Sequence, residues 1–187
     1  GIARTHGIPN PPDDTQLNLG VAALRRFLAA APAHPSAVQA AYQVGAAYLA
    51  RGKSQEAIEA FTAFLKGEGF KAETEDAKRD QAQLAMTATF QVGRILQGQR
   101  KFAEAIASWE GYLAKFPNGP QGADAQRAIL DTRLLIAADH LRRAQYAEAR
   151  AAWGAFVAQT PLDARVPQVL FQVGESFITE KKPDGAI

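Results

Sequence analysis

Few residues of the chain have types and spacing suited to chemistry. The histidines are His6, His34 and His140, which could ligate a metal or act as acid–base groups near neutral pH. None has a second potential ligand four residues away, the spacing that places two ligands on one face of a helix. The sequence has no cysteine, so it has no thiol nucleophile, thiolate metal site or disulfide. We therefore expect no metal and no cofactor.

Other signatures of catalysis are missing from the sequence as well. No Gly-x-Ser-x-Gly stretch positions a serine nucleophile, and the glycines that follow Asn118 indicate a turn, not a phosphate-binding loop. Carboxylates recur at matching places in a repeated pattern, as Glu56, Glu104 and Glu148. A catalytic residue is needed once, so this recurrence indicates a structural role. We predict that the chain has no catalytic residues and is not an enzyme.

A repeated pattern provides the elements that would position any functional residue. Residues 42–58, 90–106 and 171–187 share Gln-Val-Gly near their start, a lysine at the twelfth position and Ala-Ile at their end. A second stretch recurs from residues 56, 104 and 148, with a degenerate copy from residue 19. Self-similarity with a period of about 20 to 50 residues is typical of repeat arrays.

Both halves of this unit have the periodicity of a helix. Apolar residues of the second half fall at i, i+4, i+7 and i+8, which is one helical face. The same column holds Phe61, Leu24 and the two tryptophans, Trp109 and Trp153, so we expect core positions there and not ligand platforms. The breaks and helix ends carry glycine and proline, at Gly52, Gly98, Pro32, Pro117 and Pro161. Each unit is therefore predicted to be a helix, a break and a helix.

Small residues recur where the two helices of a unit should approach each other. Antiparallel helices packed about 8 to 10 Å apart tolerate only small side chains at their nearest approach. We expect three such contacts, Gly45 with Ala57, Gly93 with Ala105, and Ala137 with Ala149. Glycine within a helix costs about 1 kcal/mol relative to alanine, so its recurrence indicates a packing requirement.

These columns resemble the tetratricopeptide repeat, whose signature places Leu-Gly, Tyr, Ala, an aromatic residue and Pro over about 34 residues. One copy matches with Val44-Gly45, Tyr48, Ala57 and Phe61. Other copies match with Val92-Gly93, Ala105, Trp109 and Pro117, with Ala149, Trp153 and Pro161, and with Val173-Gly174 and Phe177. The resemblance implies an all-α fold, an α-solenoid of about four antiparallel helix pairs. The expected domains are a Pro-rich tail over 1–14 and a repeat domain over 15–187, truncated in its fourth unit.

The repeat departs from the regular pattern in its spacing. Successive units stand 48, 44 and 37 residues apart, measured between Gly45, Gly93, Ala137 and Gly174. The extra residues precede the first helices of the second and third units and continue a helical pattern, so long helices are expected there. Such irregular units are similar to repeat variants of bacterial cell-envelope proteins. This similarity favours the periplasm or cell envelope over the cytoplasm.

Composition and charge exclude several classes of protein. Hydrophobic residues make up 47% and charged residues 21% of the sequence, as in ordinary folded proteins. The net charge is only +2 and the two signs are interspersed, so no nucleic-acid-binding stripe is predicted. The dipeptides Arg25-Arg26, Arg142-Arg143 and Lys181-Lys182 are interpreted as solvated helix faces. No apolar run approaches the roughly 18 residues that a membrane span needs.

The resemblance implies that the first helices of the units line a concave groove for a peptide or partner helix. An apolar stripe of one aromatic or leucine per unit would run along it. The alternative is that these apolar residues pack against a neighbouring helix. The candidate partner-binding residues are Gln39, Tyr42, Leu49, Phe90, Arg94, Gln97, Leu134, Leu141, Phe171, Glu175 and Ile178.

We therefore predict a non-catalytic protein–protein interaction scaffold, with a protein or peptide as partner and no nucleic acid. The second hypothesis is a structural spacer within a larger bacterial cell-envelope protein or envelope assembly complex, because the sequence stops inside the fourth unit. The open fourth unit could also support self-association. An enzyme is the third hypothesis and has no motif in its favour.

Overall fold

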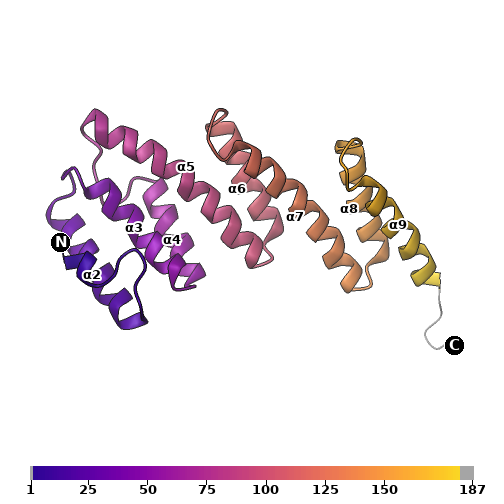
Figure 1. Cartoon of the computed structure of the whole chain (residues 1–187), viewed down its shortest axis with the longest axis horizontal. Coiled ribbons are helices and arrows are strands. Elements are labelled where there is room, and N and C mark those ends of the chain that lie inside the picture. Colours follow the sequence, from indigo (N-terminus) through magenta and orange to yellow (C-terminus); the bar gives the residue numbers. More distant parts are fainter. Residues whose placement is uncertain (1, 182–187) are drawn as a thin grey trace.

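A computed structural model describes residues 2–181, which form helices and no strand in that range. The helices lie side by side along one long axis, from α2 near the N-terminus to α9 near the C-terminus (Figure 1). The predicted all-α solenoid is confirmed. Its elements are α1 (Ile2–Thr5), α2 (Asp14–Ala30), α3 (Ala37–Ala50), α4 (Ser54–Leu65), α5 (Glu75–Gly98), α6 (Phe102–Lys115), α7 (Gly122–Arg142), α8 (Tyr146–Gln159) and α9 (Val166–Lys181).

Helix pairs repeat along this axis, as the sequence predicts. Helix α3 packs on α4, α5 on α6, and α7 on α8, while α2 and α9 extend the stack at its two ends. The first helices of the second and third pairs are long, since α5 has 24 residues and α7 has 21 against 14 in α3. The last part of the repeated pattern in the fourth unit, with Lys182, Ala186 and Ile187, lies outside the described residues.

The turn inside each pair has one shared geometry with different residues at its key position. The residue in the left-handed region is Gly52 (φ 68°), Arg100 (φ 62°) or Ala144 (φ 55°). In each turn this residue donates its N–H three residues back, and the next residue donates five back, which is the Schellman helix end. Gly98 is the last residue of α5, at the helix end where the sequence places it, but the residue with positive φ in that turn is Arg100.

The core follows the predicted aromatic column. Phe61 and Trp109 are fully buried and Trp153 is 2% exposed, so their assignment to the core is confirmed. The expected contact partner of the glycines is different, however. A Cβ on Gly45 would lie 2.5 Å from the ring of Phe61, and one on Gly93 would lie 2.4 Å from Nε1 of Trp109. The glycines therefore admit the aromatic ring of the second helix, while the alanines predicted to receive them are not the nearest atoms.

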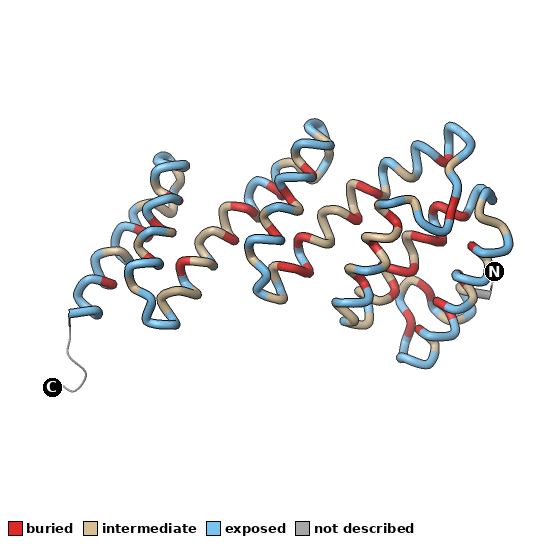
Figure 2. Tube along the Cα trace, turned by 180° about the vertical axis from the view of Figure 1, so that it is seen from behind, coloured by how far each residue is buried: buried red, intermediate tan, exposed pale blue. Residues whose placement is uncertain are grey.

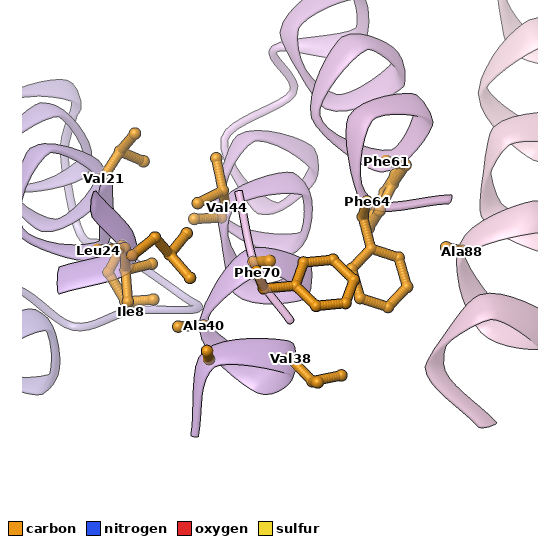
Figure 3. Packing of buried hydrophobic residues seen from close by; sticks show 14 of the residues in the cluster. Ile8, Val21, Leu24, Val38, Ala40, Val44, Phe61, Phe64, Phe70 and Ala88 are labelled. Atoms are coloured by element: carbon orange, nitrogen blue, oxygen red, sulfur yellow. The ribbon is translucent and has the colours of Figure 1, made fainter. Parts of the chain in front are cut away.

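The residues before α2 pack against it. Ile8 is 6% exposed, and it lies beside Leu24 of α2 in Figure 3. A Cβ on Gly20 would come within 2.5 Å of Ile8, so Gly20 allows this contact. In Figure 2 buried positions follow the sides where helices face each other, and the outer faces are exposed. The division into a tail over 1–14 and a repeat domain over 15–187 stays a prediction.

Candidate partner-binding face

The predicted partner-binding residues all lie on the first helices of the units. Gln39, Tyr42 and Leu49 are on α3; the others occupy α5 (Phe90, Arg94, Gln97), α7 (Leu134, Leu141) and α9 (Phe171, Glu175, Ile178). Their surroundings divide them into two groups. One group packs into the core of the array, and the other is exposed.

The apolar members on α3, α5 and α7 belong mainly to the packed group. The Tyr42 ring lies 5.5 Å from that of Phe61, and burial raises the pKa of its phenol. Phe90 lies 6.3 Å from the rings of Trp109 and Tyr112. Leu49 is half-buried against the cluster that includes Phe61, and Leu134 and Leu141 are half-buried against the cluster that includes Trp153. Tyr42 and Phe90 thus contact the second helix of their own unit, which leaves only part of each ring for a partner.

The exposed group supplies most of the accessible chemistry of this face. Gln39, Arg94 and Glu175 are exposed, and Arg94 forms no ion pair with any residue in the range 2–181. Phe171 is 63% exposed and Ile178 is 54% exposed, because no described helix covers this side of α9. Gln97 is half-buried, and its Nε2 donates a 2.8 Å hydrogen bond to Oγ1 of Thr132. That bond joins α5 to α7, so Gln97 has a structural role.

A groove of about 850 Å³ lies at the N-terminal end of the array, between α1, α2 and α3. Gln39 is the one predicted residue that lines it. Buried Leu24 and Ala40 and half-buried Phe27 supply apolar surface, and exposed Arg4, Arg26 and His34 supply polar groups. No carboxylate is among the lining residues.

His34 has its orientation fixed by two contacts. Its Nδ1 accepts a 3.0 Å hydrogen bond from the backbone N–H of Ser36, and its ring meets Phe27 edge-on at 5.3 Å. An Nδ1 that accepts leaves the proton of the neutral ring on Nε2. His34 is therefore held as a hydrogen-bond donor on the wall of the groove.

Arg4, Arg26 and His34 are not among the residues that the sequence pattern singles out. Arg26 has the pattern of a solvated helix face, and residues 1–14 have that of a tail. The signal that could have found the groove is Gly20, which occupies the column of Ala57 and Ala105. Glycine in place of alanine indicates that another segment approaches α2 more closely, and that segment carries α1.

Several carboxylates stabilise junctions within the array. Asp14 of α2 accepts from Lys53 Nζ at 2.7 Å and from Arg51 at 3.1 Å, and these hydrogen bonds, that of Lys53 above all, lower the pKa of Asp14. Asp139 of α7 pairs with Arg100 from the preceding unit and with Arg142 and Arg143. These carboxylates are occupied by arginine and lysine within the chain.

A third junction joins α7 to the turn before α9. Arg165 contacts Asp131 of α7 and donates from Nε to Asp163 at 2.8 Å. The side-chain hydrogen bond from Arg165, with a second from its backbone N–H, lowers the pKa of Asp163 to about 2. The same pairing raises the pKa of the Arg165 guanidinium above its usual value. This junction keeps its charges at neutral pH.

Two kinds of feature are absent from the described part of the chain. Between residues 2 and 181, histidine, aspartate and glutamate side chains nowhere gather in a group of three that could hold a metal ion. No helix in the same range combines the length and hydropathy that a membrane crossing requires.

The comparisons with known proteins give one family. A family model named YfiO and described as outer membrane lipoprotein matches residues 13–162, which run from the residue before α2 to the turn after α8. No curated protein matches the chain.

Proposed function

The chain belongs to the YfiO family of outer membrane lipoproteins, and we propose that it is a non-catalytic scaffold that binds a peptide or partner protein along the face of α3, α5, α7 and α9. The family supports a location in the cell envelope over the cytoplasm. It also supports a helical repeat of the tetratricopeptide type, and the assignment of these units to the cell-envelope variant is part of our proposal.

The observation that carries this proposal is the variation of the exposed face against a repeated core. The column buried in the core holds an aromatic ring in each full pair, as Phe61, Trp109 and Trp153. The column of Arg94 instead changes in size and charge along the array, with half-buried Ala46, exposed Arg94, exposed Ala138 and exposed Glu175. Packing requires the first column to repeat, whereas specific recognition requires that the second does not.

A pair of charge substitutions tests the proposal. Arg94→Glu reverses a charge on α5 that has no ion-pair partner in residues 2–181, and Ala107→Glu places the same carboxylate on the exposed side of α6. Immobilised wild-type chain and both variants are incubated with envelope extract of the source organism, and retained proteins are quantified by mass spectrometry. We expect a discrete protein that Arg94→Glu retains at least ten-fold less than wild type and Ala107→Glu retains normally. Equal retention by all three chains would contradict the proposed face.

The second candidate function is a spacer within a larger envelope protein or assembly. It is favoured by α9, where Leu170, Phe171, Phe177 and Ile178 are exposed and a Cβ on Gly174 would meet nothing within 4 Å. Such a face suits further packing, either by another helix or by a second copy. Phe171→Glu separates these cases in light scattering, because self-association through α9 would be abolished by the substitution. If the wild-type chain is monomeric at every concentration, packing of a second copy against α9 is excluded.

A further inference from the structure

The groove between α1, α2 and α3 has an unbalanced charge. Arg4 and Arg26 line it, and neither forms an ion pair with any residue from 2 to 181. Several other arginines are paired, as with Arg150, which pairs with Glu180 at 2.8 Å. Arg94 and Arg25 are also without an ion pair in that range, but neither lines this groove. No carboxylate lines the groove, so within the described residues its guanidinium groups are not paired with a counter-charge.

A second groove shows that this imbalance is local. That groove, of about 490 Å³, lies between α2, α3 and α4 on another side of α2. Arg25 lines it together with Glu68, so both signs of charge are present. Arg25 and Arg26 are adjacent, exposed and chemically identical, yet they lie in different surroundings.

The apolar part of the first groove limits what can neutralise the arginines. Leu24 and Ala40 line the groove but are buried, and Phe27 is held against His34. A concave site with an apolar base fits side chains of a peptide segment. A flat anionic lipid surface could reach the exposed arginines but not this base. A peptide can both bury apolar area in the groove and pair its carboxylates with the guanidinium groups.

We propose that this groove binds an acidic peptide segment of a partner protein, with apolar side chains against Leu24 and Phe27 and carboxylates paired with Arg4 and Arg26. The Nε2–H of His34 adds a further hydrogen-bond donor. This inference rests on the proposed scaffold function and specifies the chemistry of the partner at one end of the array.

Selection from a random peptide library displayed on phage tests the inference and does not require an identified partner. The full chain is the bait, in wild-type form and as Arg26→Glu, Arg4→Glu and Arg25→Glu. We expect wild type to enrich sequences in which Asp or Glu stands beside apolar residues. Arg26→Glu should lose that enrichment and Arg4→Glu should weaken it. Arg25→Glu, with the same change in net charge, should keep it.

An enriched peptide, labelled with fluorescein, then gives the affinity by anisotropy. We expect Arg26→Glu to weaken binding at least ten-fold and Arg25→Glu less than two-fold, with circular dichroism melts that match wild type. Vesicles of anionic phospholipid should not displace the peptide. The inference is overturned if no acidic enrichment occurs, if Arg25→Glu weakens binding as much as Arg26→Glu, or if the vesicles compete.

Failure of the inference can be told from failure of the scaffold function. If wild type enriches neutral peptides whose binding is lost in Arg94→Glu and kept in Arg26→Glu, the scaffold function stands and the acidic groove does not. If no variant and no wild-type chain enriches any sequence, both are contradicted.

Discussion

The contact between a small residue on a first helix and a ring on the second sets the closest approach within a unit. Gly93 faces the indole of Trp109, whose Nε1 also donates a 3.3 Å hydrogen bond to the backbone oxygen of Phe90. The ring is therefore buried and held at its polar end. A methyl group added at Gly93 has no flexible neighbour that could move aside.

Gly93→Ala should therefore destabilise the chain, whereas Gly111→Ala should not. Extra methyl groups in a packed core cost about 1 to 3 kcal/mol. A Cβ on Gly111, on the exposed side of α6, would meet nothing within 4 Å, so this variant should gain up to about 1 kcal/mol from helix propensity. Chemical denaturation of both variants measures the difference. A neutral or stabilising Gly93→Ala would show that the ring contact is absent.

At the scale of elements, the turns inside the pairs share hydrogen bonds but not residues. Glycine is the residue best suited to a positive φ, and only the first turn uses it, at Gly52. Arg100 of the second turn also pairs with Asp139, so its strained backbone is combined with an inter-unit contact. Ala144 of the third turn is exposed and has no such contact to offset the strain.

Ala144→Gly should stabilise the chain by about 0.5 to 1 kcal/mol, because relief of the left-handed strain exceeds the added freedom of the unfolded chain. The matched control is Ala147→Gly in the first turn of α8, which is exposed and helical. The control should lose up to about 1 kcal/mol. The midpoints of urea denaturation measure the stability change of both variants. A loss of stability in both would contradict the account of the turn.

The ion pair of Asp163 and Arg165 should make the stability of the folded chain depend on pH in the acid range. The pKa of Asp163 is about 2 in the folded chain against 3.8 for an unperturbed aspartate. Its stabilising contribution is therefore complete above pH 3.8 and is lost as the pH falls through about 2. Asp163→Asn should lower the melting temperature at neutral pH, and the difference from wild type should shrink as the pH falls from 3.8 to about 2.

Asp80→Asn, at an exposed position of α5, serves as the control and should change the melting temperature little at any pH. A difference between wild type and Asp163→Asn that does not vary with pH would mean that Asp163 is not ionised in the junction.

Over the whole molecule, the core is divided into local clusters that follow the pairs. Ile58 contacts both the first and the second cluster, and the equivalent residue of the second pair is Ile106. At that position the third pair has Arg150, which lies 4.0 Å from the ring centroid of Phe177 and pairs with Glu180. The last junction is thus more polar than the earlier ones.

The repeat made the array predictable, because each unit presents the same small and aromatic columns at helical spacing. Residues such as Phe61 and Trp109 therefore identified the core directly. The orientation of Tyr42 and Phe90 was not settled by spacing, since a half-buried ring satisfies the pattern whether it faces a partner or its own unit. The α1 groove was not predicted either, because its one signal, Gly20 in a column of alanines, occurs once and does not identify Ile8 as the residue that packs there.

The most direct test of the scaffold is site-specific photo-crosslinking in the cells that make this protein. A photoreactive amino acid replaces Arg94 on the proposed binding face or, in a second strain, Ala107 on the exposed side of α6. We expect a discrete crosslinked product from position 94 and none from position 107. No product from position 94, or the same product from both positions, would contradict the claim that this chain binds its partner through the first helices of the array.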